Sequence, residues 1–386
     1  MAVNDLNATI GGLLRDLAAV QPSTQKAFGY KRAASTVLGL ERQMNTMAGA
    51  DGEFAKVPGL GPSSMRVVTE VIASGGSPSA EKLIDDSGKR ADIDKRRGLS
   101  SGFLSRAEAL RILEDPSCDG PSPADYRGDL QMHSEWSDGS ASVAEMTLGC
   151  ISRGYRYAAI TDHSYGLPIA GGVSMEKLAQ QHVEIDRLNR ECGSAFRIIK
   201  GIEANIAADG ALDITPDEMA GLELVLAAPH SRLRAADDQT TRMLRVVTTP
   251  GVHVLAHPRG RMTGTRAGVQ ADWPRVFREA ARALVAIELD GDPSRQDLDH
   301  TLARVAFDSG CLFAVDSDAH SVRELRYTDI ALAHARLAGI PPERIVNCWP
   351  LEDLLAWMVE RRSGAVRPRR RRKAAGPRLN PDASGG

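Results

Sequence analysis

The chain has 386 residues, of which 42% are hydrophobic and 25% are charged, and its formal net charge is −2. These proportions are ordinary for a soluble globular protein and exclude a wholly disordered or fibrous chain. No run approaches the roughly 18 apolar residues of a membrane-spanning helix, and the small net charge gives no global attraction to nucleic acid.

The opening segment, MAVNDLNATIGGLL, has no basic stretch leading into an apolar one, so we expect no secretory leader. The five cysteines are scattered and include no CxxC pair, which argues against a disulfide framework and against a cysteine-based zinc site. We therefore expect a cytoplasmic protein that does not bind membranes.

Residues 1–75 are predicted to be helical. Within them, the glycine-rich loop VPGLGPSS at 57–64 precedes an apolar helix at 65–73. Residues 76–124 are poor in apolar residues and are expected to be a linker with one short helix, where Ser105 and Glu108 have the spacing of a capping box.

Residues 125–360 are predicted to form the large domain, and residues 361–386 are a basic, low-complexity tail that cannot bury a core. The large domain alternates short apolar runs with helical patterns, which indicates parallel βαβ units. The seven runs are 130–133, 157–163, 196–206, 222–230, 252–257, 284–290 and 312–320. Seven units in this length fit a distorted (β/α)7 TIM-like barrel, with a doubly wound open sheet as the alternative.

Nearly every run ends in a histidine or a carboxylate. Because the carboxyl ends of barrel strands converge on one face, these side chains are expected to meet there, and imidazole with carboxylate is a donor set for divalent metals. The candidate ligands are His133, Asp138, His163, Glu203, His230, His257, Asp318 and His320. Eight ligands exceed what one ion needs, so we expect two or three ions, with Glu203 able to bridge two of them.

In chain order, the segments DLQMHSEWSDG, ITDHS, GIEANI, AAPHS, AHPRGR and DSDAH resemble the motifs of the PHP (polymerase and histidinol phosphatase) domain. The resemblance covers about 125–360. It implies a distorted (β/α)7 barrel that holds a trinuclear metal site formed by the eight ligands above and hydrolyses phosphoesters. One position departs from the family pattern, because the first motif is usually HxH and Gln131 stands here in place of the first histidine. Gln131 offers only a neutral amide oxygen, so the site keeps three ions with one held weakly, keeps two, or is partly degenerate.

AHPRGRMTG, IELDGDPSRQDL and DSDAHS further resemble the PHP domain appended to bacterial family X DNA polymerases. The segments AFGYKRAA and VPGLGPSSMRVVTEVIASG resemble the small N-terminal domain of those polymerases, with its helix-hairpin-helix. A tight turn that exposes free N–H groups at a helix start suits a DNA phosphate, although a plain connection between helices has the same pattern. The candidate DNA contacts are Gly59, Gly61, Ser63, Lys31 and Arg32.

Two features of those polymerases are missing. Residues 76–124 are too short for the polymerase palm, so we expect no nucleotidyl transfer. Val67 occupies the place of the lyase lysine found in some members, which makes lyase chemistry doubtful.

The expected function is metal-dependent hydrolysis of DNA phosphodiesters, as a 3′–5′ exonuclease or as an enzyme acting on 3′ ends or abasic sites in repair. Arg259, Arg261 and Arg295 are candidate clamps for phosphate oxygens. The resemblance favours Mn²⁺, while Zn²⁺ and Fe²⁺ also suit the ligand types. The expected partner is DNA at ends, gaps or abasic sites, with a separate polymerase in trans also possible, and the chain is expected to be a monomer. The alternatives are a small-molecule phosphatase of the histidinol-phosphate type and a metal-impaired DNA-binding module.

Overall fold

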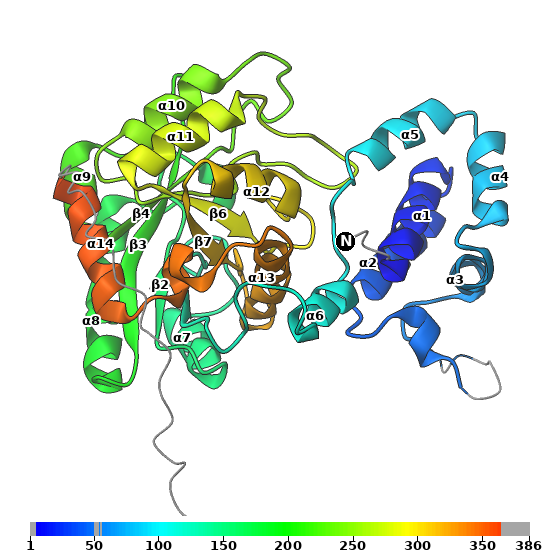
Figure 1. The fold of residues 1–386 in the computed structure, drawn as a ribbon, viewed down its shortest axis with the longest axis horizontal. Helices are drawn as coiled ribbons and strands as arrows, with labels where there is room; N and C mark the ends of the chain where they lie inside the picture. The colour runs from blue at the N-terminus through cyan, green and yellow to red at the C-terminus, as the bar shows by residue number, and fades with distance from the viewer. Residues whose placement is uncertain (1–4, 50–53, 55, 364–386) are drawn as a thin grey trace, which may run out of the picture.

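The computed structural model describes residues 5–49, 54 and 56–363. The predicted basic tail therefore lies outside the described residues, apart from 361–363, which continue the last helix. Figure 1 shows a barrel surrounded by helices and, beside it on the right, a separate group of helices made by the N-terminal part of the chain.

Seven parallel strands form one sheet in the order of the sequence, which confirms the predicted TIM-like α/β barrel. The strands are β1 (Gly128–Asp129), β2 (Tyr157–Ile160), β3 (Arg197–Asn205), β4 (Leu224–Ala228), β5 (Val254–Leu255), β6 (Ala286–Asp290) and β7 (Leu312–Asp316). A parallel bridge between Met132 and Ala319 joins the chain after β1 to the chain after β7 and nearly closes the barrel.

The first strand differs from the prediction, because the ladder covers Gly128–Asp129 rather than 130–133. The backbone N–H of Leu130 donates instead to the Asp316 carboxylate at 2.8 Å, which ends regular pairing at that point. The barrel still holds the residues that follow, since His133 N donates to the Ala319 carbonyl at 2.8 Å.

Helices cover the outside of the barrel, and the last helix of the described chain closes the end opposite the carboxyl ends of the strands. The helices are α7 (Val143–Ser152), α8 (Met175–Cys192), α9 (Pro216–Ala220), α10 (Thr240–Thr248), α11 (Trp273–Ala283), α12 (His300–Asp308), α13 (Thr328–Leu337) and α14 (Leu351–Ser363). Short 3₁₀ helices occur at Met44–Met47, Pro168–Ala170, Val322–Tyr327, Pro342–Arg344 and Val346–Cys348. Leu354, Trp357 and Met358 of α14 pack against apolar side chains of the strands, so the opposite end of the barrel is left for the site.

The N-terminal helices share their own core. They are α1 (Leu6–Val20), α2 (Thr24–Leu38), α3 (Pro62–Ser74), α4 (Pro78–Asp86) and α5 (Arg90–Gly98). The predicted short helix after Ser105 is present as α6 (Arg106–Glu114), but the rest of the predicted linker over 76–124 is not one, because α4 and α5 belong to this core. The buried apolar residues of α4 and α5 are few, namely Ala80, Ile84 and Ile93. The composition of the segment therefore does not indicate that it packs into a core.

The helical region and the barrel are joined by buried hydrogen bonds. The Gln296 side chain accepts from Leu104 N and donates to Leu104 O, both at 2.8 Å. Ser105 caps α6 by accepting from Glu108 N, but Glu108 turns to Arg111, so only half of the predicted capping box forms. Among the described residues, no helix is both long and apolar enough to cross a membrane.

Candidate metal centre

The buried carboxylate of Glu203 lies at the centre of the candidate site. Glu203 is on β3, and the chain after β2 pairs beside it through a parallel bridge to His163. Oε2 of Glu203 lies 3.3 Å from Nε2 of His133 and 3.1 Å from Nδ1 of His163. Oε1 lies 3.3 Å from Nε2 of His230 and 2.9 Å from Nε2 of His257. Four imidazoles from four strand ends therefore converge on one carboxylate.

Two partly exposed ligands complete the open side of the centre. Oδ1 of Asp138 lies 3.5 Å from Nε2 of His163 and 3.4 Å from Nε2 of His320. The side chains of Asp138 and His320 are 34% and 29% exposed, whereas those of Glu203 and His133 are fully buried. Asp138 and His320 therefore form the solvent-facing side of the candidate centre.

Asp318 and Gln131 occupy a third part of the centre. Asp318 Oδ1 lies 3.0 Å from Nε2 of His133. When the Gln131 amide is turned so that its nitrogen donates to Glu288, at 3.1 Å from Oε2, the amide oxygen lies on the side of Asp318. Gln131 thus stands where a ligand is expected and presents a weak neutral donor there.

The charges of the centre are strongly coupled. Burial alone would lower the pKa of His163, but the carboxylates of Glu203 and Asp138 outweigh it and raise the pKa to about 10. Burial is likewise outweighed at His320, where Asp138 and Asp318 raise the pKa to about 9. Burial would raise the pKa of Glu203, yet the neighbouring imidazoles hold it well below its usual range. The negative potential of the carboxylates therefore favours cations throughout the pocket.

The donor set fits divalent metal ions. Three groups of side chains each bring their ligand atoms within 4.8 Å of one another: His133, Asp138, His163 and His320; His163, Glu203 and His230; and His133, Glu203 and Asp318. Nδ1 of His163 and Nε2 of His230 face Glu203 but are buried without a hydrogen-bond partner among the described residues. Since buried polar atoms normally have partners, such nitrogens are suited to metal ligation.

Positioning side chains that our sequence analysis did not single out hold the ligands in place. Asp162 accepts from the backbone and hydroxyl of Ser134, at 2.8 and 2.6 Å, and from Gln181 at 2.6 Å, which anchors the loop that carries Asp138. Glu288 accepts from the backbone N–H of His257. Such contacts orient ligands, but a lone Asp or Glu within a strand run carries no sequence signal of that role.

Two ligand positions have unusual backbone conformations. His257 and Asp318 have φ of 25° and 52°, in the left-handed region that L-residues rarely adopt. Each such conformation costs on the order of 1–3 kcal/mol and persists where the surrounding structure enforces it, typically at functional sites.

The three candidate arginines do not lie together. Arg295 contacts the Asp318 carboxylate and lies 3.8 Å from Asp290, so it belongs to the metal-ligand cluster. The contacts of Arg259 and Arg261 differ from the prediction of a clamp at the reaction centre, because both guanidinium groups face Asp299, at 3.5 and 2.9 Å.

The candidate DNA contacts lie on the N-terminal helical region. Lys31 and Arg32 are exposed on α2, and Gly61 and Ser63 are exposed where α3 begins. Gly59 has φ of 92°, and a Cβ there would come within 2.7 Å of Thr36 Oγ1, so both the turn and its approach to α2 require glycine.

Fold and site together define a class: a parallel α/β barrel with a histidine- and carboxylate-lined candidate metal centre at the carboxyl ends of its strands. No protein-family model matches the chain. Over 233 residues the chain is 37% identical to the DNA polymerase/3′-5′ exonuclease PolX of Bacillus subtilis. This alignment covers 60% of the chain but only 41% of that protein.

Two further relatives are named as phosphatases. The chain is 28% identical over 233 residues to a probable phosphatase of Syntrophotalea carbinolica, covering 57% of the chain and 90% of that protein. It is 27% identical over 237 residues to the probable phosphatase YcdX of Escherichia coli, covering 58% and 91%. Among solved structures, the zinc- and phosphate-bound histidinol phosphate phosphatase of Lactococcus lactis aligns with 15% identity and a TM-score of 0.42, over 54% of the chain and 94% of that structure.

Proposed function

We propose that this protein is a metal-dependent phosphoesterase that hydrolyses phosphodiester bonds of DNA, as a 3′–5′ exonuclease or as an enzyme that processes 3′ ends or abasic sites. The observation that carries the proposal is the convergence of four imidazoles on the Glu203 carboxylate, with Asp138, Asp318 and His320 around it. We expect two or three ions, and Mn²⁺ is our first choice. Divalent ions held there would stabilise negative charge on a phosphate group and would supply a nucleophilic water near neutral pH.

The chain's own residues have distinct parts in this reaction. Glu203, His133, His163, His230 and His257 form a buried floor that would hold the ions. Asp138 and His320 line the open side where the phosphate arrives. Arg295, whose side chain is 22% exposed, lies against Asp318 and can donate to a phosphate oxygen as negative charge builds up on it.

Two features favour DNA as the substrate. One relative, 37% identical to the chain over 233 residues, has a name that includes a 3′-5′ exonuclease. The helical region also exposes Lys31, Arg32 and the glycine turn before α3, which together suit contacts to a phosphate backbone. A polymerase acting in trans would fill the gaps that such an enzyme prepares.

The test is a nuclease assay with the full chain, loaded with Mn²⁺ or Zn²⁺, on end-labelled single strands and gapped duplexes. We expect nucleotide release that His163→Ala or Asp318→Ala reduces by at least about a hundredfold, because each change removes a ligand. His182→Ala is the matched control, since His182 lies on the outer helix α8. Intact DNA after incubation with protein of confirmed metal content would refute the proposal.

A small-molecule phosphatase is the second candidate. Its specific support is that the two relatives named probable phosphatases align with this chain over 90% and 91% of their own length. Hydrolysis of histidinol phosphate without action on DNA would select this candidate.

A further inference from the structure

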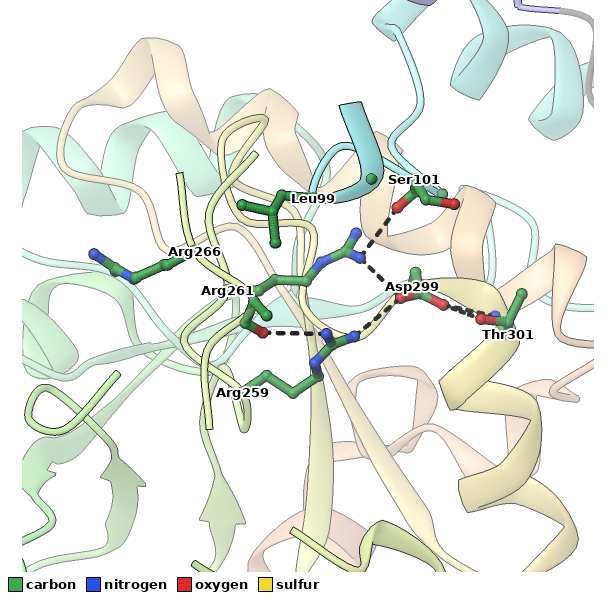
Figure 2. A pocket seen from close by; sticks show the side chains of 10 residues that line it. Leu99, Ser101, Arg259, Arg261, Arg266, Asp299 and Thr301 are labelled. Atoms are coloured by element: carbon green, nitrogen blue, oxygen red, sulfur yellow. Dashed lines mark hydrogen bonds and ion pairs between the residues drawn. The ribbon is translucent and has the colours of Figure 1, made fainter. Parts of the chain in front are cut away.

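Three arginines line a cavity of about 200 Å³ between the helical region and the barrel (Figure 2). One wall is the turn that follows α5, at Gly98–Gly102. The other is the loop after β5, with Arg259, Arg261 and Arg266, and the start of α12, with Asp299 and Thr301. We call this space the junction cavity. None of the predicted metal ligands lines it.

The junction cavity has an excess of positive charge. Three arginines and one aspartate, Asp299, are among the residues that line it, so the lining carries a formal charge of about +2. Arg259 and Arg261 turn towards Asp299, whereas the Arg266 side chain points away from them (Figure 2). Asp299 is already shared: it pairs with Arg261 at 2.9 Å and Arg259 at 3.5 Å, and it also caps α12 by accepting from Thr301 N at 3.0 Å.

The arginines also have donors to spare. The Arg261 side chain is only 5% exposed, and its Nη2 is buried without a hydrogen-bond partner among the described residues. Arg266 donates through Nε to the Gly260 carbonyl at 2.7 Å, and no described residue accepts from its terminal nitrogens. Burial lowers the pKa of both side chains, and for Arg266 the nearby Arg295 and Arg234 lower it further. An anion would relieve the repulsion and accept from the unused donors.

The junction cavity is linked to the metal centre through one residue. Arg261 Nε donates to the backbone carbonyl of Arg295 at 3.0 Å, while the Arg295 side chain contacts Asp318. A ligand with a single phosphate fills one of these places, whereas a nucleic-acid strand carries a phosphate at every nucleotide and can fill both.

We propose that the junction cavity binds a backbone phosphate of the nucleic-acid strand whose reactive phosphate lies in the metal centre. This inference rests on the proposed function and adds a substrate contact to it. The cavity volume of about 200 Å³ corresponds to about seven liquid waters and has room for a phosphate group. The contact would set how the strand enters the barrel and would favour polymers over small phosphoesters.

The experiment compares Arg266→Ala with Arg278→Ala, which removes an exposed arginine from the outer helix α11. The metal-loaded full chain is assayed on a single-stranded oligonucleotide and on bis(p-nitrophenyl) phosphate, a small phosphodiester. We expect Arg266→Ala to raise KM for the oligonucleotide about tenfold more than KM for the small diester, because only the polymer reaches the junction cavity. Arg266→Lys should restore part of the loss.

Equilibrium binding of the labelled oligonucleotide, followed by fluorescence anisotropy at several salt concentrations, gives a readout that does not need activity. Arg266→Ala should flatten the slope of log affinity against log salt by about 0.7, the value for one contact to a single strand, whereas Arg278→Ala should keep the slope. If wild-type protein hydrolyses neither substrate, the proposed function fails while the salt slope still tests the junction cavity.

Three results would overturn the inference. An equal rise of KM for both substrates would mean that Arg266 acts at the metal centre. An oligonucleotide KM and salt slope like those of wild type would mean that no strand contacts Arg266. The third result concerns inhibition of both reactions by added inorganic phosphate. If Arg266→Ala changes only this inhibition, the junction cavity binds a free anion instead of a strand.

Discussion

Glu203 is the single residue on which the candidate centre depends most. Its two carboxylate oxygens each face two imidazoles, so it can join ligand groups that would otherwise be separate sites. Its side chain is fully buried, and an uncompensated charge there would be costly, which is why opposite charges must gather around it.

We predict that Glu203→Gln lowers the number of bound divalent ions and reduces phosphoesterase activity by more than the about 10–100-fold that changes around a metal site typically cost. The amide keeps the shape of the side chain but removes the charge that draws the ions together. Elemental analysis after gel filtration, together with the activity assay, measures both effects.

Glu176→Gln is the control for this change, because Glu176 is exposed in the first turn of α8. An unchanged metal content in Glu203→Gln would show that Glu203 is not a bridging ligand.

At the scale of elements, one buried histidine ties three parts of the barrel together. Nδ1 of His253 accepts from Val225 N, in β4, at 3.0 Å, and Nε2 faces the Met358 carbonyl, in α14, at 3.0 Å. This arrangement needs the neutral imidazole with its proton on Nε2. Burial accordingly lowers the pKa of His253 from 6.5 to about 3.

The protein should therefore lose stability in mild acid. Below about pH 6.5 the unfolded chain binds a proton at His253 that the folded protein excludes, so the free energy of unfolding falls as pH falls towards 3, by up to about 1.4 kcal/mol per pH unit. Urea unfolding at a series of pH values measures the slope.

His253→Asn should be less stable at pH 7.5 but should show a shallower slope between about pH 6.5 and 4, because the titrating group is gone. His334, whose pKa burial lowers to about 3, accounts for part of the slope that remains. A slope identical to that of wild type would contradict the assignment to His253.

At the scale of the whole molecule, the helical region is fixed to the barrel by buried polar contacts. Gln296 is 1% exposed and holds both backbone groups of Leu104, while Asp5 accepts from Ser105 N at 2.6 Å and from Ser105 Oγ at 2.7 Å. These contacts tie the helical region, which carries the exposed basic residues of α2, to the barrel, which carries the candidate metal centre.

We predict that Gln296→Ala uncouples the two parts. It leaves the buried N–H and C=O of Leu104 without partners, at about 1–3 kcal/mol for each group. Calorimetry should show one transition for wild type and two for the variant, with the helical region unfolding first.

Gln180→Ala, on the exposed face of α8, should melt like wild type. A single transition at the wild-type temperature in Gln296→Ala would mean that the junction does not depend on this side chain.

The barrel and the position of its site were predictable because alternating apolar runs and helical patterns specify parallel units, and parallel strands must end on the same face. The helices α4 and α5 were not predictable, because their buried apolar residues are few, namely Ala80, Ile84 and Ile93, and most of the segment is polar. The support that Asp162 gives to the loop of Asp138 was not predicted either, since hydrogen bonds to a residue 28 positions away leave no local pattern.

The sequence by itself determined the kind of fold and which side chains are available as ligands, because strand period and residue type are local properties. Only the tertiary structure decided how those side chains share partners: that four imidazoles meet on Glu203, that Arg295 joins Asp318, and that Arg259 and Arg261 turn to Asp299 instead. Residues that follow the same strand can point to different places, and packing between distant segments selects among them.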